Sequence, residues 1–149
     1  SLIYNIGGVS GGSGIDIKGL DFSNETVNDT QKKIVAVATN SAKYGISARS
    51  GYCQAWVADV YQAVTGSRGS AHCALCAADM WAVSSDWSKI PVGAAIYGYS
   101  SSKYGHVGIY IGNGMVAHNI GYIKIEPIED WIKTYKGFAW GWENNMSLV

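Results

Sequence analysis

Hydrophobic residues in the first half of the chain recur at helical spacing. Residues 28–43 start with a polar cluster typical of a helix N-terminus and continue with apolar residues on one side. Residues 53–65 carry the same spacing and stop at Gly66, and the Ala-rich residues 71–83 form a third such segment. The pattern therefore predicts three helices, the second of which begins at Cys53.

After Pro91 the hydrophobic pattern changes to short runs typical of strands. These runs predict strands over residues 94–97, 106–111, 115–119, 122–125 and 138–142, and a short helix over 129–135. Helices followed by an antiparallel sheet define an α+β fold. We expect the N-terminal helices to pack on a central antiparallel β-sheet.

The loop Gly112-Asn113-Gly114 separates two of these strands and predicts a hairpin. A two-residue loop would send His106 and His118 to opposite faces of the sheet, because side chains alternate along a strand. A three-residue loop, with a type I turn and a left-handed Gly114 in a bulge, pairs Gly108 with His118 and puts both histidines on one face. We expect the three-residue register.

Length and composition fit a single globular domain. The 149 residues can bury one core, 48% of them are apolar and 15% are charged, and the sequence has no apolar run long enough for a spanning helix. Residues 7–14 are all Gly, Ser or Val, so residues 1–28 are expected to be a flexible linker and N-terminal extension that follows another module, and residues 29–149 the folded domain. The 11 basic and 11 acidic residues give no excess charge for nucleic acid or anionic membranes.

Three cysteines cannot all pair with one another, so at least one is free. Cys73 and Cys76 follow His72 and could form a disulfide, half of a metal site or two buried small residues. The sequence has no second Cys or His cluster to complete a zinc site, so no metal is expected. Burial of both cysteines in a helix is the favoured interpretation.

Cys53 and two histidines are the candidates for chemistry, and no cofactor is needed. A helix N-terminus lowers the pKa of a thiol, and Cys53 opens a predicted helix. His106 opens a strand after Gly105 and can accept the thiol proton, while His118 can orient its imidazole. The backbone N–H of Cys53 is a candidate oxyanion donor.

A helix-opening Cys followed by Gly-His-Val-Gly-Ile-Tyr-Ile-Gly (residues 105–112) and then His118 resembles the NlpC-type cell-wall cysteine peptidases, which have a papain-like fold. The resemblance covers residues 29–142. It implies a catalytic Cys53, His106 and His118, and a tyrosine upstream of the cysteine that faces the active site, which Tyr44 matches. Tyr52, next to the nucleophile, is a further substrate-binding or oxyanion candidate.

The family resemblance implies hydrolysis of an amide bond in the stem peptide of bacterial peptidoglycan, commonly between D-glutamate and the dibasic residue after it. Together with the Gly-rich linker, it implies the catalytic module of a phage lysin or wall hydrolase that works outside the cell or in the wall. The Tyr52-Cys53-Gln54-Ala55 run is closer to the related amidase group named for Cys and His. An N-acetylmuramoyl-L-alanine amidase, a protein amidase and a non-catalytic wall-binding module therefore remain open.

Overall fold

The fold is described from a computed structural model, in which residues 14–22 and 24–149 are placed. Helices come first: α1 (Asp29–Thr39), the 3₁₀ turn η1 (Ser41–Tyr44), α2 (Cys53–Thr65) and α3 (Ala74–Trp81). The second half contains β2 (Ala82–Ser84), η2 (Trp87–Lys89), β3 (Ala95–Gly98), β4 (His106–Gly112), β5 (Met115–Asn119), β6 (Ile123–Pro127), α4 (Ile128–Tyr135), β7 (Ala139–Gly141) and η3 (Glu143–Asn145).

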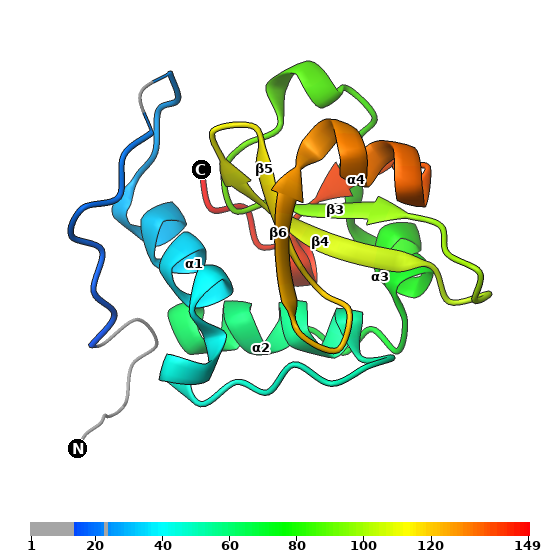
Figure 1. The fold of residues 1–149 in the computed structure, drawn as a ribbon, viewed down its shortest axis with the longest axis horizontal. Helices are drawn as coiled ribbons and strands as arrows, with labels where there is room; N and C mark the ends of the chain where they lie inside the picture. Colours follow the sequence, from blue (N-terminus) through cyan, green and yellow to red (C-terminus); the bar gives the residue numbers. More distant parts are fainter. Residues whose placement is uncertain (1–13, 23) are drawn as a thin grey trace.

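The strands form one antiparallel sheet in the order β2-β7-β3-β4-β5-β6. Helices α1 and α2 lie together on one side of it, and α4 crosses the other side (Figure 1). The expected α+β architecture, with N-terminal helices on a central antiparallel sheet, is confirmed. Among the described residues, no helix is long and apolar enough to cross a membrane.

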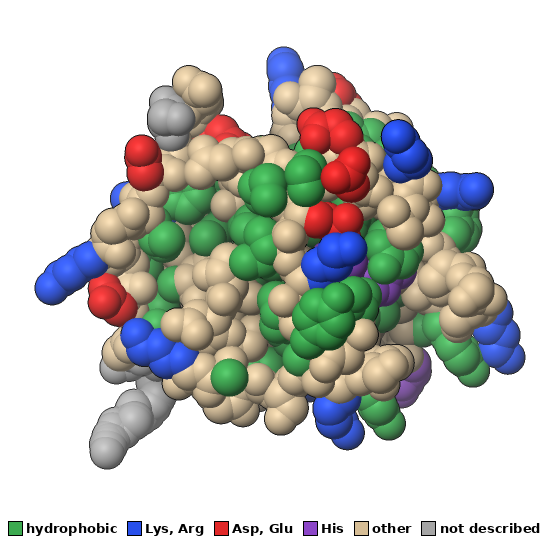
Figure 2. All heavy atoms as spheres, in the orientation of Figure 1, with side chains coloured by type: hydrophobic (Ala, Val, Ile, Leu, Met, Phe, Trp, Pro, Cys, Tyr) green, Lys and Arg blue, Asp and Glu red, His purple; other side chains and the backbone are tan. Residues whose placement is uncertain are grey.

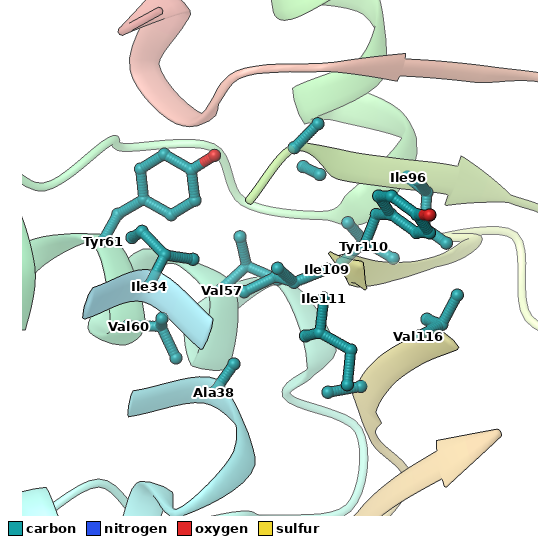
Figure 3. Packing of buried hydrophobic residues seen from close by; sticks show 14 of the residues in the cluster. Ile34, Ala38, Val57, Val60, Tyr61, Ile96, Ile109, Tyr110, Ile111 and Val116 are labelled. Atoms are coloured by element: carbon teal, nitrogen blue, oxygen red, sulfur yellow. The ribbon is translucent and has the colours of Figure 1, made fainter. Parts of the chain in front are cut away.

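Alternation along the strands assigns residues to the two faces of the sheet. In β4, Val107 and Ile109 face α2, where they join Ile34 and Val57 in a core without solvent exposure (Figure 3). The alternate residues, beginning with His106, face α4. The core therefore lies between the sheet and the first two helices, and the polar side chains of β4 lie under α4.

Local polar groups determine where helices α1 and α3 begin and where α1 ends. The predicted helix 28–43 is divided at Asn40 into α1 and η1, and a capping box between Asn28 and Gln31 starts α1. The predicted helix 71–83 begins only at Ala74, because the Cys73 side chain caps its N-terminus, and it is followed by β2, which the pattern did not predict.

The hairpin between β4 and β5 has the predicted register but a different turn. Ile109 pairs with Ala117, which places Gly108 opposite His118. Gly112 pairs with Met115, so the loop has two residues, Asn113 and Gly114, both with positive φ as in a type I′ turn. A bulge between Tyr110 and Gly112 supplies the extra residue that restores the parity.

The segment before α1 is held to the folded domain. Asn113 donates its backbone N–H to Glu25 Oε1 and its side-chain amide to the Asp21 carbonyl, at 2.7 and 2.8 Å. The side chain of Phe22 lies against Gly112. Most of the predicted Gly/Ser linker falls on residues 1–13, outside the described residues.

Charged side chains of both signs are spread over the surface. Figure 2 shows acidic side chains gathered over α4, whose first turn carries Glu129 and Asp130, while Lys and Arg are distributed around the rest of this face. Carboxylates at a helix N-terminus interact favourably with the helix dipole.

Candidate active site

Cys53 is the first residue of α2, as the sequence predicted, and it is partly buried. The residue before it, Tyr52, makes no side-chain hydrogen bond to the helix N-terminus. No capping side chain therefore occupies the first backbone N–H groups of α2. These groups lie where an oxyanion hole needs hydrogen-bond donors.

A groove with a volume of about 740 Å³ runs past the N-terminus of α2. Its lining includes Cys53, His106, Tyr52, Asn119 and Tyr135. The groove thus brings the predicted nucleophile and the predicted base to one surface, although they are 53 positions apart in the sequence.

The two predicted histidines are in direct contact. Nε2 of His106 lies 2.8 Å from Nδ1 of His118, and both residues are on the α4 face of the sheet. His106 is 7% exposed and His118 is fully buried. The predicted hairpin register therefore produces a pair of hydrogen-bonded imidazoles that reaches from the groove into the interior.

Glu126 extends this chain and was missed by sequence reasoning. Its Oε2 atom lies 2.5 Å from Nε2 of His118, and its Oε1 atom lies 3.7 Å from Nζ of Lys124. In β6, Lys124 is paired with His118, so Glu126 is the diagonal neighbour on the same face. Three adjacent strands thus supply one side chain each to a buried polar chain.

Helix α4 covers both imidazoles with aromatic rings. Tyr135 stacks on His106 with 4.1 Å between ring centroids, and Trp131 lies 6.1 Å from His106 and 6.4 Å from His118. Nothing in the spacing of residues 129–135 showed where this helix would dock.

Two glycines allow the close packing around His106. Gly105, directly before it, has a φ of +74°, and a Cβ there would lie 2.5 Å from Cγ of Leu75. Gly98 pairs with His106, and a Cβ there would lie 2.6 Å from the Tyr135 carbonyl oxygen. Side chains at these positions would displace α3 or α4 from the site.

Burial keeps both imidazoles of the resting site uncharged. Burial and the neighbouring His118 lower the pKa of His106 to about 3. Burial also lowers the pKa of His118, outweighing the Glu126 carboxylate, which raises it. The free site therefore holds neutral imidazoles near pH 7.

The pKa of the Cys53 thiol differs from the expectation based on the sequence. Burial raises the pKa of Cys53, and hydrogen bonds from the backbone N–H groups of Val107 and Gln54 lower it by less. The predicted lowering by the helix N-terminus is thus wrong for the net shift, because removal of the sulfur from water has the larger effect. Any nucleophilic attack by Cys53 would therefore require that the thiol first give up its proton.

Asn119 supports the loop that carries the nucleophile. Its side-chain amide donates to the carbonyl oxygens of Arg49 at 2.8 Å and Tyr52 at 3.3 Å. As predicted, it points to the face opposite His118. Consecutive residues of β5 therefore position the histidine pair and the loop before Cys53.

The two candidate tyrosines lie in different places. Tyr52 is half exposed at the groove, with the Arg49 guanidinium 4.0 Å from its ring centroid. Tyr44 lies in η1, where its hydroxyl accepts a hydrogen bond from the Asp16 backbone N–H, and it is not among the residues that line the groove. The 3₁₀ turn after α1 holds Tyr44 away from the site.

Cys73 and Cys76 form a disulfide at the start of α3. The favoured interpretation of two separate cysteines inside a helix is therefore wrong, because Cys73 precedes the helix and its sulfur is bonded one turn ahead. The metal alternative also loses both thiolates. Cys73 and the exposed His72 line the groove, which leaves Cys53 as the free thiol of the chain.

Comparisons with known proteins identify the fold. A scan against protein-family models and a search of the curated proteins each find no match. Among solved structures, NlpC2 from Trichomonas vaginalis is similar at 18% identity and a TM-score of 0.53, covering 86% of this chain and 49% of that one. An NlpC/P60 family protein from Bacillus cereus ATCC 10987 is similar at 19% identity and a TM-score of 0.48, covering 69% and 38%.

The chain therefore has the α+β fold of NlpC-type proteins, as its sequence predicted. It spans about half or less of the length of these two neighbours. The likeness concerns the fold, and the activity has to be argued from the site itself.

Proposed function

We propose that this chain is a cysteine hydrolase that cuts an amide bond in the stem peptide of bacterial peptidoglycan. The observation that carries the proposal is the shared groove: Cys53 and His106 line it together, and His106 is hydrogen-bonded to the buried His118. A nucleophile, a base and a group that orients the base are the parts that covalent acyl transfer requires.

The reaction follows from these positions. The Cys53 sulfur attacks the carbonyl carbon of the scissile amide while His106 accepts the thiol proton, and the backbone N–H of Cys53 donates to the developing oxyanion. The intermediate collapses as the C–N bond breaks and His106 passes the proton to the leaving amine. Water, deprotonated by His106, then attacks the thioester, and the proton returns to the sulfur as the C–S bond breaks.

Within the stem peptide, we propose the bond between D-glutamate and the dibasic residue, which the family resemblance implies. The described groove lining is small, neutral polar or aromatic apart from Ile120, His72 and His106. It supplies no carboxylate or ammonium partner for the charges of that substrate. The charge of the groove lining therefore does not distinguish this bond from the muramoyl–alanine bond. The masses of the released fragments will distinguish them.

We propose that the domain works outside the cell or in the wall, as the catalytic module of a phage lysin or wall hydrolase with a further module upstream. The disulfide between Cys73 and Cys76 supports an oxidising compartment, because such bonds are rare where thiols are kept reduced.

The test is a digestion of peptidoglycan from several bacteria, with fragments identified by mass spectrometry. The wild-type chain should release new stem-peptide termini and Cys53→Ala should release none. Asp79→Ala, at an exposed position of α3 that does not line the groove, serves as a control and should digest like the wild type. Equal binding of wall by wild type and Cys53→Ala without any release would instead support a wall-binding module.

A further inference from the structure

The hydrogen bonds that link three polar side chains under α4 constrain where the protons of these side chains lie. The chain begins at Glu126, passes through His118 and ends at His106, which lines the groove. Both nitrogens of His118 and Nε2 of His106 have one hydrogen-bond partner each. Proton positions along it can therefore be worked out one after another.

Glu126 determines the first position. A carboxylate can only accept hydrogen bonds, and the Lys124 ammonium lies 3.7 Å from Oε1. Nε2 of His118, 2.5 Å from Oε2, must therefore carry a proton and donate it. Because buried His118 is neutral, its Nδ1 has no proton and is an acceptor.

His118 determines the second position in the same way. The acceptor Nδ1 of His118 lies 2.8 Å from Nε2 of His106, so this Nε2 carries a proton. His106 is also neutral near pH 7, which leaves its Nδ1 with a lone pair. Nδ1 of His106 makes no hydrogen bond to any residue that the structure describes, and its ring lines the groove with Cys53.

We propose that Glu126 is a positioning residue that fixes the tautomers of both histidines, so that Nδ1 of His106 is the atom that accepts the Cys53 proton. Glu126 touches neither the substrate nor the thiol and acts through His118. Its catalytic meaning rests on the proposed function, but the proton positions can be measured without any substrate.

The isosteric variant Glu126→Gln separates the charge from the shape. A glutamine can present its oxygen or its NH₂ group to His118. In the second orientation Nε2 of His118 becomes the acceptor, Nδ1 donates to His106, and the His106 proton moves to Nδ1, where it blocks the base. The variant should therefore populate two tautomers in place of one.

The measurement is long-range ¹H–¹⁵N correlation of the imidazoles at pH 7, with only three histidines to assign. We expect His106 and His118 to carry their protons on Nε2 in the wild type and a second set with protons on Nδ1 in Glu126→Gln. Lys124→Gln, which keeps the carboxylate on His118, should retain the wild-type set. A wild-type proton on Nδ1 of His106, or an unchanged set in Glu126→Gln, would overturn the proposal.

Two further readouts separate positioning from folding. Alkylation of Cys53 by iodoacetamide should be slower in Glu126→Gln than in Lys124→Gln, by about twofold if the two tautomers are equally populated. With a cleaved stem peptide, kcat should fall by the same factor with little change in KM, because only molecules with the lone pair on Nδ1 of His106 can accept the thiol proton. Equal alkylation rates, or an effect on KM alone, would count against the proposal.

The outcomes for the two proposals can be told apart. Correct tautomers without release of wall fragments would leave the proton chain intact and refute the peptidoglycan substrate. Release of wall fragments by a protein with the opposite tautomers would support the peptidoglycan substrate and refute the proposed proton chain. If Glu126→Gln does not fold, as judged by thermal unfolding, the wild-type proton positions decide alone.

Discussion

The ring of Tyr135 lies nearly parallel to the imidazole of His106, with 4.1 Å between centroids and 25° between planes. Tyr135 comes from the last turn of α4 and His106 from the first position of β4. Gly98 makes this contact possible because it leaves room for the Tyr135 backbone. The stack separates the proposed base from water on one side, and this burial is the main cause of its low pKa.

Removal of this ring should change the titration of His106. In Tyr135→Ala, water reaches the imidazole and the pKa should rise from about 3 toward the ordinary value of about 6.5. Tyr135→Phe keeps the stack and should keep the low pKa. An NMR titration of the His106 ring protons measures both, and equal values in the two variants would contradict the role of the ring.

Stability should decrease in acid because of His106. Its pKa is about 3 when folded and about 6.5 when unfolded, so the unfolded chain binds a proton that the folded chain refuses. Stability is therefore complete above about pH 6.5 and is lost as the pH falls toward 3, with a slope that approaches about 1.4 kcal/mol per pH unit for one such group. Urea unfolding at several pH values measures this slope.

The matched variant for this effect is His106→Asn, which cannot titrate. It should lose less stability than the wild type between pH 7 and pH 4, although His118, whose pKa is also lowered, leaves part of the acid sensitivity in place. Parallel curves for the two proteins would show that His106 is not the cause.

The reactivity of Cys53 should increase at high pH. Because burial raises its pKa, the alkylation rate should inflect above the ordinary thiol value of about 8.5. Stopped-flow labelling with iodoacetamide measures the profile, and Cys53→Ala gives the background. An inflection below pH 7 would show that the resting site is a thiolate–imidazolium pair, with His106 charged.

The unreduced, denatured protein should contain one titratable thiol, and the reduced protein three, because Cys73 and Cys76 are bonded. The double variant Cys73→Ser/Cys76→Ser should be less stable by about 2 kcal/mol, as expected for a short closed loop. It should also loosen the start of α3, where the Leu75 backbone N–H donates to the Tyr104 carbonyl beside the groove. Three thiols before reduction would contradict the disulfide.

The sequence alone predicted the elements whose information is local. The helix that begins at Cys53 follows from apolar spacing and a glycine stop, and both are properties of fourteen consecutive residues, 53–66. The common face of His106 and His118 follows from parity within one hairpin. The predicted type of turn in this hairpin was wrong, because a two-residue turn with a bulge gives the same parity as a three-residue loop.

Only the tertiary structure revealed what surrounds these residues. Glu126 alternates with Ile123 and Ile125 like a solvent-facing polar residue, and it becomes buried because β6 pairs beside β5 under α4. The stack of Tyr135 on His106, the disulfide at the groove and the raised pKa of Cys53 likewise depend on contacts between distant segments. Periodicity fixes which face of an element is apolar, whereas burial and proton affinity depend on which elements pack against that face.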